Sequence, residues 1–326
     1  MATAFLTGGT GFLGGHVARA LSELGWRVRL LARDPRKARD ARLAGLALDV
    51  VPGDLSDQNA LAQALSGADA IVHAAGLVNA RSLEDYRAVN VRGTEQLLAA
   101  ARRSAPDAMF VHVSSQAAAG PAREGRPVLA GDPARPVSWY GVSKHESELA
   151  VSEFWKGPWV ILRPGVIFGP GDRGLFVYFR MAASGWIPLP AGQTRVQVIA
   201  AEQSALAIAR AASRRDLTGQ TGFLCDPQPI RLADLAGLIA TLPRRPARIL
   251  PVPNAAVRLL GRWETLRETL TGKSRPFNAD KAREILAGDW LCEGGPMRQA
   301  LDLPPDVSLA QSLRAAWDWY RAAGWL

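Results

Sequence analysis

Short apolar runs alternate with segments of helical hydrophobic spacing through the first half of the chain. After an apolar run at residues 4–6, hydrophobic side chains recur every three or four residues from Phe12 to Leu24, the spacing of a helix that buries one face. Such alternation predicts a parallel sheet covered by helices on both faces. The pattern predicts strands over 4–6, 26–32, 48–51, 70–73, 109–113 and 159–162, and further helices over 83–102 and 139–154.

The pattern changes after Pro164, where Pro and Gly become frequent and the strict alternation fades. Residues 196–212 have the pattern of one more strand and helix that return to the sheet. We therefore predict an α/β fold of Rossmann type, with a doubly wound parallel sheet and a smaller, mostly C-terminal lobe. The predicted division is a core domain over 1–165, rejoined by 196–225, and a lobe over 166–195 and 226–326.

Composition narrows the class of protein. The chain has 326 residues, 48% of them hydrophobic, which suits one two-part globular enzyme. No apolar run is long enough to span a membrane, and the chain begins almost directly with its first strand. Cys225 and Cys292 lack metal-ligand spacing, so we expect no metal, no disulfide framework and a reducing compartment. We therefore expect a cytoplasmic protein.

The chain is basic, with a formal net charge of +9 and a pI of about 10.2. Two interpretations stay open. The charge is compositional, because the basic residues are spread along the chain, or it attracts an anionic ligand or membrane surface. In the second case the protein would lie peripherally at the inner membrane face. No DNA- or RNA-reading motif is present, so we expect no nucleic acid partner.

A glycine-rich turn follows the first strand and opens the first helix. Gly8 permits a tight turn, Gly11 lets backbone N–H groups approach a pyrophosphate, and Gly14 lets the helix pack close to the strand. The helix N-terminus adds its positive dipole end. We therefore predict a dinucleotide site whose residues in this turn are Gly8, Thr10, Gly11, Phe12, Leu13 and Gly14.

A phenol and an ammonium stand four residues apart in the predicted helix 139–154. Tyr140 and Lys144 share one helix face, so the lysine can lie near the phenol. Its charge, together with that of an oxidised nicotinamide, would lower the pKa of the phenol toward the range of a general acid and base. His73 and His112 lie in predicted strands and are expected to be packed structural residues.

An ordered set of motifs resembles the extended short-chain dehydrogenase/reductases, the NAD(P)-dependent epimerase/dehydratase group. The motifs are TGGTGFLG at 7–14, GDLSD at 53–57, HAAG at 73–76, NVRGT at 90–94, HVSSQAAAG at 112–120, YGVSK at 140–144 and RPGVIFGPGD at 163–172. The resemblance covers nearly the whole chain.

The resemblance implies a role for each matching position. Ser115 would be the catalytic hydroxyl that holds a carbonyl oxygen, with Tyr140 and Lys144 as the acid and base pair and Asn90 as a support of the active-site end of its helix. The implied cofactor contacts, besides the glycine turn, Tyr140 and Lys144, are Asp54 and Leu55 at the adenine, Ala74, Ala75 and Gly76 near the ribose and nicotinamide, and Pro164 and Val166 at the nicotinamide carboxamide.

The end of the second predicted strand favours NADP(H) over NAD(H). Sites that prefer NAD place an acid there to bind the ribose 2′-hydroxyl. This chain has Ala32 at that position and Arg33 directly after it, and a guanidinium can pair with a 2′-phosphate. Arg36 and Lys37 could add charge nearby.

Two substrate classes stay open within the enzymes. The first class is a ketone on an apolar molecule. It is indicated because the chain is similar to 3β-hydroxysteroid dehydrogenase, dihydroflavonol reductase and bacterial keto-sphingolipid (oxidised ceramide) reductase. The predicted lobe is rich in aromatic residues that could cover such a substrate. The alternative is a nucleotide-sugar epimerase or dehydratase, favoured by Arg195 but not by Val166, where those relatives carry Asn. The aromatic residues are Phe168, Phe176, Tyr178, Phe179, Trp186 and Trp263.

Two further features leave alternatives open. Residues 255–270 are either an amphipathic lid that rests on lipid headgroups or an ordinary helix packed on the lobe, with Val257 placed on the same side as Leu259 and Trp263. A non-catalytic NADP-binding sensor or structural subunit is the alternative to an enzyme, although such proteins usually lose Tyr or Lys of the pair. The resemblance also implies a homodimer through helices that include the one with Tyr140.

Overall fold

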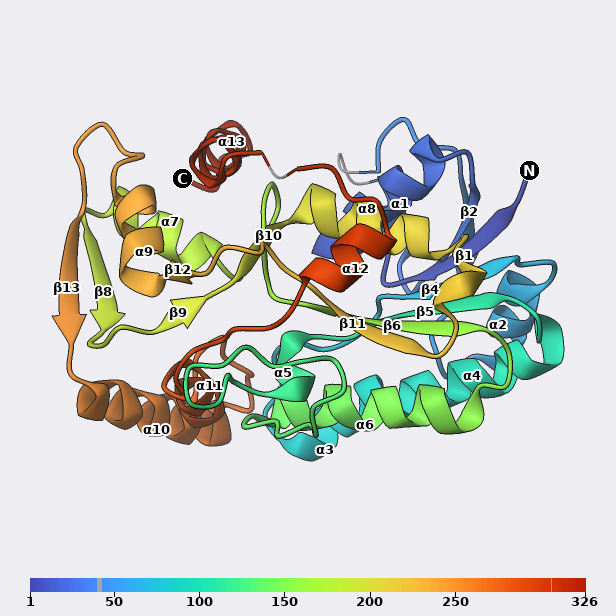
Figure 1. Ribbon diagram of the computed structural model, residues 1–326, viewed down its shortest axis with the longest axis horizontal. Coiled ribbons are helices and arrows are strands. Elements are labelled where there is room, and N and C mark those ends of the chain that lie inside the picture. The colour runs from blue at the N-terminus through green and yellow to red at the C-terminus, as the bar shows by residue number, and fades with distance from the viewer. Residues whose placement is uncertain (40–42, 306) are drawn as a thin grey trace.

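The structure is a computed structural model that describes residues 1–39, 43–305 and 307–326 (Figure 1). Its centre is a parallel sheet of seven strands among the described residues, in the order β11-β6-β5-β4-β1-β2-β3. This confirms the predicted Rossmann-type α/β class. The strands are β1 (Thr3–Thr7), β2 (Arg27–Ala32), β3 (Leu48–Pro52), β4 (Ala70–His73), β5 (Met109–Val113), β6 (Trp159–Pro164) and β11 (Gln220–Leu224).

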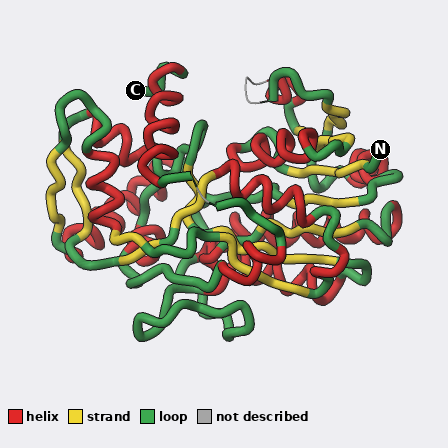
Figure 2. Tube along the Cα trace, turned by 45° about the horizontal axis from the view of Figure 1, so that its top comes forward, coloured by secondary structure: helices red, strands yellow, loops and turns green. Residues whose placement is uncertain are grey.

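Helices cover both faces of this sheet, as Figure 2 shows with strands in yellow and helices in red. Successive side chains of a strand point to opposite faces, so Ala4 and Leu6 of β1 join one apolar cluster and Phe5 joins the other. The helices on the face of Ala4 and Leu6 are α1 (Phe12–Glu23), α8 (Ala201–Ala211) and α12 (Gly295–Ala300). The helices on the face of Phe5 are α2 (Gln58–Leu65), α4 (Arg92–Ser104) and α6 (Trp139–Phe154).

Beyond β6 the chain builds a third apolar cluster, at the left of Figure 1. Phe179 and Tyr320 lie at its centre, fully buried. The elements in and around this part of the chain are β7 (Val166–Phe168), α7 (Phe176–Ala183), β8 (Trp186–Pro190), β9 (Arg195–Val196), β10 (Val198–Ala200), β12 (Ile230–Arg231), α9 (Leu232–Ala240), β13 (Arg248–Val252), α10 (Asn254–Thr271), α11 (Ala279–Ile285) and α13 (Leu309–Ala322).

Two predicted elements differ from the structure. The helix predicted over 83–102 is divided into α3 (Leu83–Tyr86), a π-helical turn (Arg87–Val91) and α4. The strand predicted near residue 196 does not join the central sheet, because β10 pairs with β7 in a separate two-stranded sheet. The strand that joins the central sheet is β11, which pairs with β6. The division into two domains stays a prediction.

Candidate active site

The glycine turn is held by close backbone contacts. Gly8 has a φ of +74°, and a Cβ there would lie 2.6 Å from the Ala75 nitrogen. A Cβ on Gly14 would lie 2.1 Å from the Gly8 carbonyl oxygen, so α1 can start against the turn only with glycine at this position. Gly8 therefore brings the turn into contact with the segment of Ala74, Ala75 and Gly76 that follows β4.

The N-terminus of α1 fits a dinucleotide phosphate. Gly11 is the exposed N-cap of this helix, no side chain caps it, and no acidic residue stands in its first turn. Backbone N–H groups at such an end attract an anion through hydrogen bonds and the helix dipole. Thr10, Phe12 and Leu13 are half-buried around the same turn.

The predicted adenine side of the site lies at the ends of β2 and β3. Arg33 and Asp54 are both exposed, and the charge of Arg33 contributes to the lowered pKa of Asp54, although hydrogen bonds from Ser56 contribute more. Leu55 packs against α4, where a Cβ on Gly93 would approach its side chain to 2.9 Å. Arg36 is paired with Asp34, with 2.9 Å between Nε and Oδ1, so Asp34 is already engaged.

Ser115 and Tyr140 meet at the carboxyl end of β5. Ser115 caps the short helix α5 (Gln116–Ala119), and its hydroxyl accepts a 3.1 Å hydrogen bond from the Ala117 nitrogen. Burial raises the pKa of the Tyr140 phenol to about 12, and a hydrogen bond with the Ser115 side chain opposes that rise. For the chain on its own the pKa is therefore raised, because burial outweighs the hydrogen bond with Ser115. The predicted lowering includes the charge of an oxidised nicotinamide and stays a prediction.

Lys144 is anchored to the same strand end. It is buried, and its ammonium donates a 2.8 Å hydrogen bond to the Val113 carbonyl oxygen. Burial lowers the pKa of Lys144 to about 8, while the nearby Glu148 carboxylate opposes this. Ser115, Tyr140 and Lys144 thus converge from β5 and α6 on one end of the sheet.

Asn90 connects the predicted nicotinamide side to α6. Its amide nitrogen donates to the Leu77 carbonyl oxygen and the Ser143 hydroxyl at 3.1 and 2.9 Å, and its oxygen accepts from the Leu77 nitrogen at 2.7 Å. Asn90 is buried in the π-helical turn, which lets it face both partners. It is therefore placed to position the Gly76–Leu77 backbone beside the residue that precedes Lys144.

His73 links the glycine-turn strand to Asn90. Its ring nitrogens lie 2.7 Å from the Thr7 hydroxyl and 2.9 Å from the Thr94 hydroxyl, which donates to the Asn90 carbonyl oxygen. Burial lowers the pKa of His73 to about 3, so the ring stays neutral. His112 is also fully buried, so both histidines are packed within the fold as expected.

Comparison with known proteins agrees with this geometry. The family model described as "NAD dependent epimerase/dehydratase family" matches residues 4–219. The chain belongs to this family. It is 34% identical over 331 residues to "Ceramide reductase" of Caulobacter vibrioides (98% of this chain, 95% of the relative). It is 30% identical over 334 residues to "4-hydroxy-2-methyl-3-oxo-4-farnesyl-3,4-dihydroquinoline-1-oxide ketoreductase" of Stigmatella aurantiaca (90% and 97%).

Solved structures share the fold at lower identity. The dTDP-glucose 4,6-dehydratase DesIV of Streptomyces venezuelae, solved with NAD, superposes with a TM-score of 0.79 at 23% identity (99% of this chain, 98% of that chain). The family and the two relatives named as reductases indicate that this chain is a dehydrogenase- or reductase-type enzyme of a family that uses a nicotinamide cofactor.

Pro164 and Val166, which are predicted to contact the nicotinamide carboxamide, lie where β6 passes into β7. Pro164 is buried at the end of β6, whereas Val166 is 37% exposed. Between them, a Cβ on Gly165 would lie 3.5 Å from the side-chain oxygen of Gln116, the residue after Ser115. This loop therefore borders the end of β5 that carries the serine.

The aromatic residues predicted to cover the substrate do not act as one group. Phe179 is fully buried in the third apolar cluster, and the half-buried Phe176 packs against Tyr320 and Trp325 at its edge. Trp186 and Trp263 are instead 47% and 57% exposed. Helical spacing and aromatic content alone could not separate core from surface.

Sequence reasoning missed a buried ion pair behind the site. Arg163 Nε and Nη2 donate to Glu148 Oε1 and Oε2 at 2.8 and 2.7 Å, and Ser114 donates to Glu148 Oε1 at 2.5 Å. Burial alone would raise the pKa of Glu148, but these bonds hold it below its usual value. Two signals were available: Glu148 follows Lys144 by one helical turn, and Arg163 interrupts an apolar strand.

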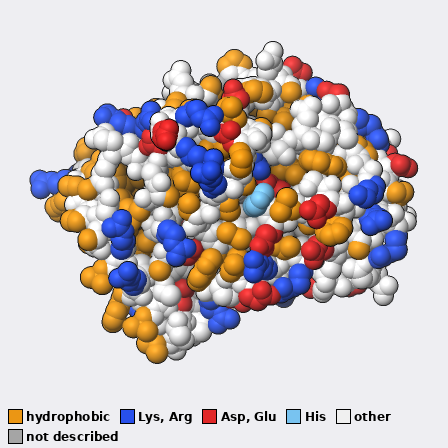
Figure 3. Space-filling model, turned by 60° about the horizontal axis from the view of Figure 1, so that its bottom comes forward, with side chains coloured by type: hydrophobic (Ala, Val, Ile, Leu, Met, Phe, Trp, Pro, Cys, Tyr) orange, Lys and Arg blue, Asp and Glu red, His pale blue; other side chains and the backbone are white. Residues whose placement is uncertain are grey.

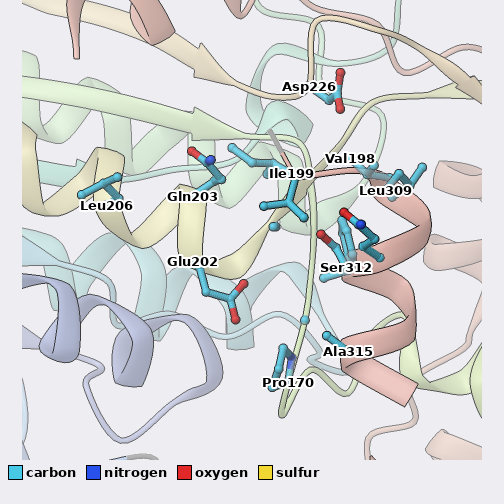
Figure 4. A pocket seen from close by; sticks show the side chains of 15 residues that line it. Pro170, Val198, Ile199, Glu202, Gln203, Leu206, Asp226, Leu309, Ser312 and Ala315 are labelled. Carbon is cyan, nitrogen blue, oxygen red and sulfur yellow. The ribbon is translucent and has the colours of Figure 1, made fainter. Parts of the chain in front are cut away.

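A cavity of about 490 Å³ lies elsewhere, between α8, α13 and the β7–β10 pair (Figure 4). Val198, Ile199 and Leu309 give it an apolar wall, with Glu202 and Asp226 at its margin. Ser115, Tyr140 and Lys144 are not among its described lining residues. The catalytic candidates of this family therefore lie outside the cavity.

Proposed function

We propose that this chain is an NADP(H)-dependent reductase that converts a ketone on an apolar, lipid-like substrate into an alcohol. The observation that carries the proposal is the convergence of Ser115, Tyr140 and Lys144 at the carboxyl end of β5. The glycine turn and the uncapped start of α1 lie at the same edge of the sheet, where ligands of parallel α/β folds bind.

The roles of the side chains follow from their protonation states. A bound reduced nicotinamide would supply hydride to the carbonyl carbon. With a pKa of about 12, the Tyr140 phenol keeps its proton at neutral pH, which is the form that can donate to the carbonyl oxygen. The Ser115 hydroxyl, beside the phenol, would hold that oxygen by a hydrogen bond.

Lys144 would assist by its charge. Its pKa of about 8 leaves most of the ammonium protonated at neutral pH. Lys144 follows Tyr140 by one turn of α6, and a cation near a phenol stabilises the phenolate that remains after proton donation, so Lys144 would lower the free energy of that step. Asn90 would act as a positioning residue through Leu77 and Ser143.

Arg33 supports NADP(H) over NAD(H). It is exposed at the end of β2, where the preceding residue, Ala32, offers no carboxylate to a ribose hydroxyl. Because Asp34 is held by Arg36, Arg33 would present the guanidinium to a 2′-phosphate.

The substrate class rests on the relatives and on Arg195. The relatives named as a ceramide reductase and a farnesyl-quinoline ketoreductase match at least 90% of this chain. Arg195, which in nucleotide-sugar enzymes would face the diphosphate, forms an ion pair with Asp289, with 2.6 Å between Nη2 and Oδ2. This pairing, together with Val166 in place of Asn, favours the apolar ketone over the nucleotide sugar.

The test is a screen of NADPH oxidation with N-acyl 3-keto-sphingoid bases, 3-ketosteroids, flavanonols and UDP- and dTDP-sugars. We expect turnover of a keto-lipid, and we expect Tyr140→Phe to lower kcat by about 10²–10⁴-fold while NADPH still binds. Tyr86→Phe, which removes the hydroxyl of the ring packed 6.0 Å from Tyr140, is the matched control.

Different results of the screen would replace the proposal. Turnover of a nucleotide sugar, or release of tightly held NAD on denaturation, would identify a sugar epimerase or dehydratase. NADPH binding without turnover of any carbonyl would favour the sensor or structural subunit. We retain the homodimer, the cytoplasmic location and the absence of a nucleic acid partner as proposals.

A further inference from the structure

Helix α10 carries a row of exposed apolar side chains. Leu259, Leu260, Trp263, Leu266 and Leu270 are between 50% and 76% exposed, on one helix of 18 residues. Single exposed leucines are ordinary, but five large apolar side chains on one helix form a patch of the kind that marks a binding surface.

The row faces away from the protein. The residues of α10 that are buried are Val257, Gly261 and Glu268, and a Cβ on Gly261 would lie 2.8 Å from Ala282 of α11. With about 3.6 residues per turn, Leu259, Trp263, Leu266 and Leu270 fall on the opposite side of the helix. Leu260 lies at the edge of the row, next to Arg267. The prediction that placed Val257 with this row was therefore wrong, because Val257 belongs to the packed face.

Basic residues border the row on both sides. The helical repeat places Arg258 and Arg262 along one border and Arg267 along the other. The two acids of α10 lie outside the row and already have partners. Glu268 is buried and accepts a hydrogen bond from the Arg275 nitrogen, and Glu264 is paired with Arg267 and Arg275. Figure 3, from the side that carries α10, shows hydrophobic and basic side chains together at its left.

We propose that this surface of α10, defined by Leu259, Leu260, Trp263, Leu266, Leu270 and the bordering arginines, docks on an anionic lipid bilayer. An apolar row between cationic borders is the arrangement with which a helix lies in the interface, its leucines among acyl chains and its guanidinium groups at the phosphates. The net charge of +9 adds attraction to such a surface. No helix that the structure describes could cross a bilayer, so the contact is peripheral.

A second copy of the chain fits this surface less well. A two-fold interface places the same patch on both partners. Arg258 and Arg262 line one border, and Glu264 beside the other border is already paired with Arg267 and Arg275. Two such patches would therefore offer the arginines of each copy no unpaired acid of α10. An anionic surface satisfies both borders at once.

The docking surface lies next to the candidate active site. α10 packs on α11, whose Asp280 accepts a 2.9 Å hydrogen bond from the nitrogen of Trp139, the residue before Tyr140. At the C-terminal end of α10, Arg81 donates a hydrogen bond to the carbonyl oxygen of Gly272, the residue that caps this helix. A docked α10 would therefore hold the site close to the bilayer. The docking itself does not depend on the identity of the ketone.

Vesicle co-sedimentation tests the proposal with the full chain. We expect binding to phosphatidylcholine vesicles that contain about one third phosphatidylglycerol, weakening with salt, and little binding to phosphatidylcholine alone. The double variant Leu259→Gln/Leu270→Gln should lower the partition coefficient about tenfold or more, because two exposed side chains lose their apolar burial. The control is Leu149→Gln/Phe154→Gln, which changes two apolar residues of α6 that are 44% and 46% exposed.

Two additional measurements distinguish bilayer docking from misfolding and from self-association. NADPH oxidation with a water-soluble ketone should be unchanged in the α10 variant, which excludes misfolding. The proposal is overturned if the wild-type chain ignores anionic vesicles or if both double variants bind equally. It is also overturned if the α10 variant converts a dimer into a monomer by light scattering, which would make the row an interface between copies.

Discussion

The Arg163 guanidinium donates two hydrogen bonds, of 2.8 and 2.7 Å, to the Glu148 carboxylate, and both side chains are at most 7% exposed. This contact joins β6 to α6 one helical turn after Lys144. Ser114, the neighbour of Ser115, donates to the same carboxylate. The buried charge pair therefore fixes α6, which carries Tyr140 and Lys144, to β6, and the hydrogen bond from Ser114 ties the end of β5 beside Ser115 to the same carboxylate.

Breaking this pair from one side should be costly. Arg163→Met leaves the Glu148 carboxylate buried without its cation, and we expect the free energy of unfolding to fall by about 3–5 kcal/mol. Urea unfolding measures this. Arg231→Met, which breaks the exposed pair with Asp234, should cost no more than about 1 kcal/mol. Equal losses in the two variants would mean that burial does not set the strength of the contact.

Acid should weaken the same contact. The pKa of Glu148 is lowered in the folded chain from a usual value of 4.5, so the unfolded chain takes up a proton first as pH falls. The stability contributed by Glu148 is present above the usual value and is lost as pH falls through the lowered one. The double variant Glu148→Leu/Arg163→Met should lose this part of the acid dependence, measured by thermal unfolding across the range. An unchanged profile would assign the acid sensitivity to other carboxylates.

Arg33→Ala should change cofactor choice. We expect the KM for NADPH to rise by about tenfold or more and the KM for NADH to change little, because only NADPH carries the 2′-phosphate. Arg27→Ala, at the other end of β2, is the control for a lost surface charge. Equal effects of Arg33→Ala on both cofactors would contradict the proposed preference.

Lys144→Met should abolish reduction and raise the free energy of unfolding. At neutral pH the fold holds Lys144 charged although burial lowers its pKa to about 8, and Met keeps the alkyl chain without the charge. After allowing for the lost bond to Val113, we expect the free energy of unfolding to rise by about 1–2 kcal/mol while reduction stops.

The pH dependence of the free energy of unfolding tests the same variant. Between pH 8 and 10.5 the unfolded wild-type chain binds the Lys144 proton more tightly than the folded chain, so the free energy of unfolding rises with pH there. The variant should lack this rise. A less stable variant at neutral pH would show that the ammonium stabilises the fold.

The two thiols should resist modification in the folded chain. Cys225 and Cys292, far apart in sequence, lie with their sulfurs 3.3 Å apart and are at most 3% exposed. The contact between them and their burial raise the pKa of Cys292. We expect iodoacetamide to label them at least about 100-fold more slowly in native buffer than in guanidinium chloride. Rapid native labelling would show that this region opens readily.

Local pattern was enough to predict the fold class and the neighbourhood of the site. The strands around Leu6, Val72 and Val111 are short apolar runs, and the spacing of Tyr140 and Lys144 is a property of one helix. The Arg163–Glu148 pair was not predicted, because the position of each residue in its own element does not show that β6 and α6 bring the two side chains together. The raised pKa of Tyr140 was missed for the same reason, since it reports how much water the folded chain removes.

Strand β11 has a consequence for how the chain is made. It pairs with β6 through residues 220–224, so the strand next to β5 and Ser115 is covered by a segment that is synthesised long after it. A product that stopped near residue 165 would leave β6 paired with β5 on one side and unpaired on the side that β11 covers, and an open strand edge recruits other chains. Truncated translation products should therefore aggregate, and a half-length fragment is a poor starting point for a minimal cofactor-binding module.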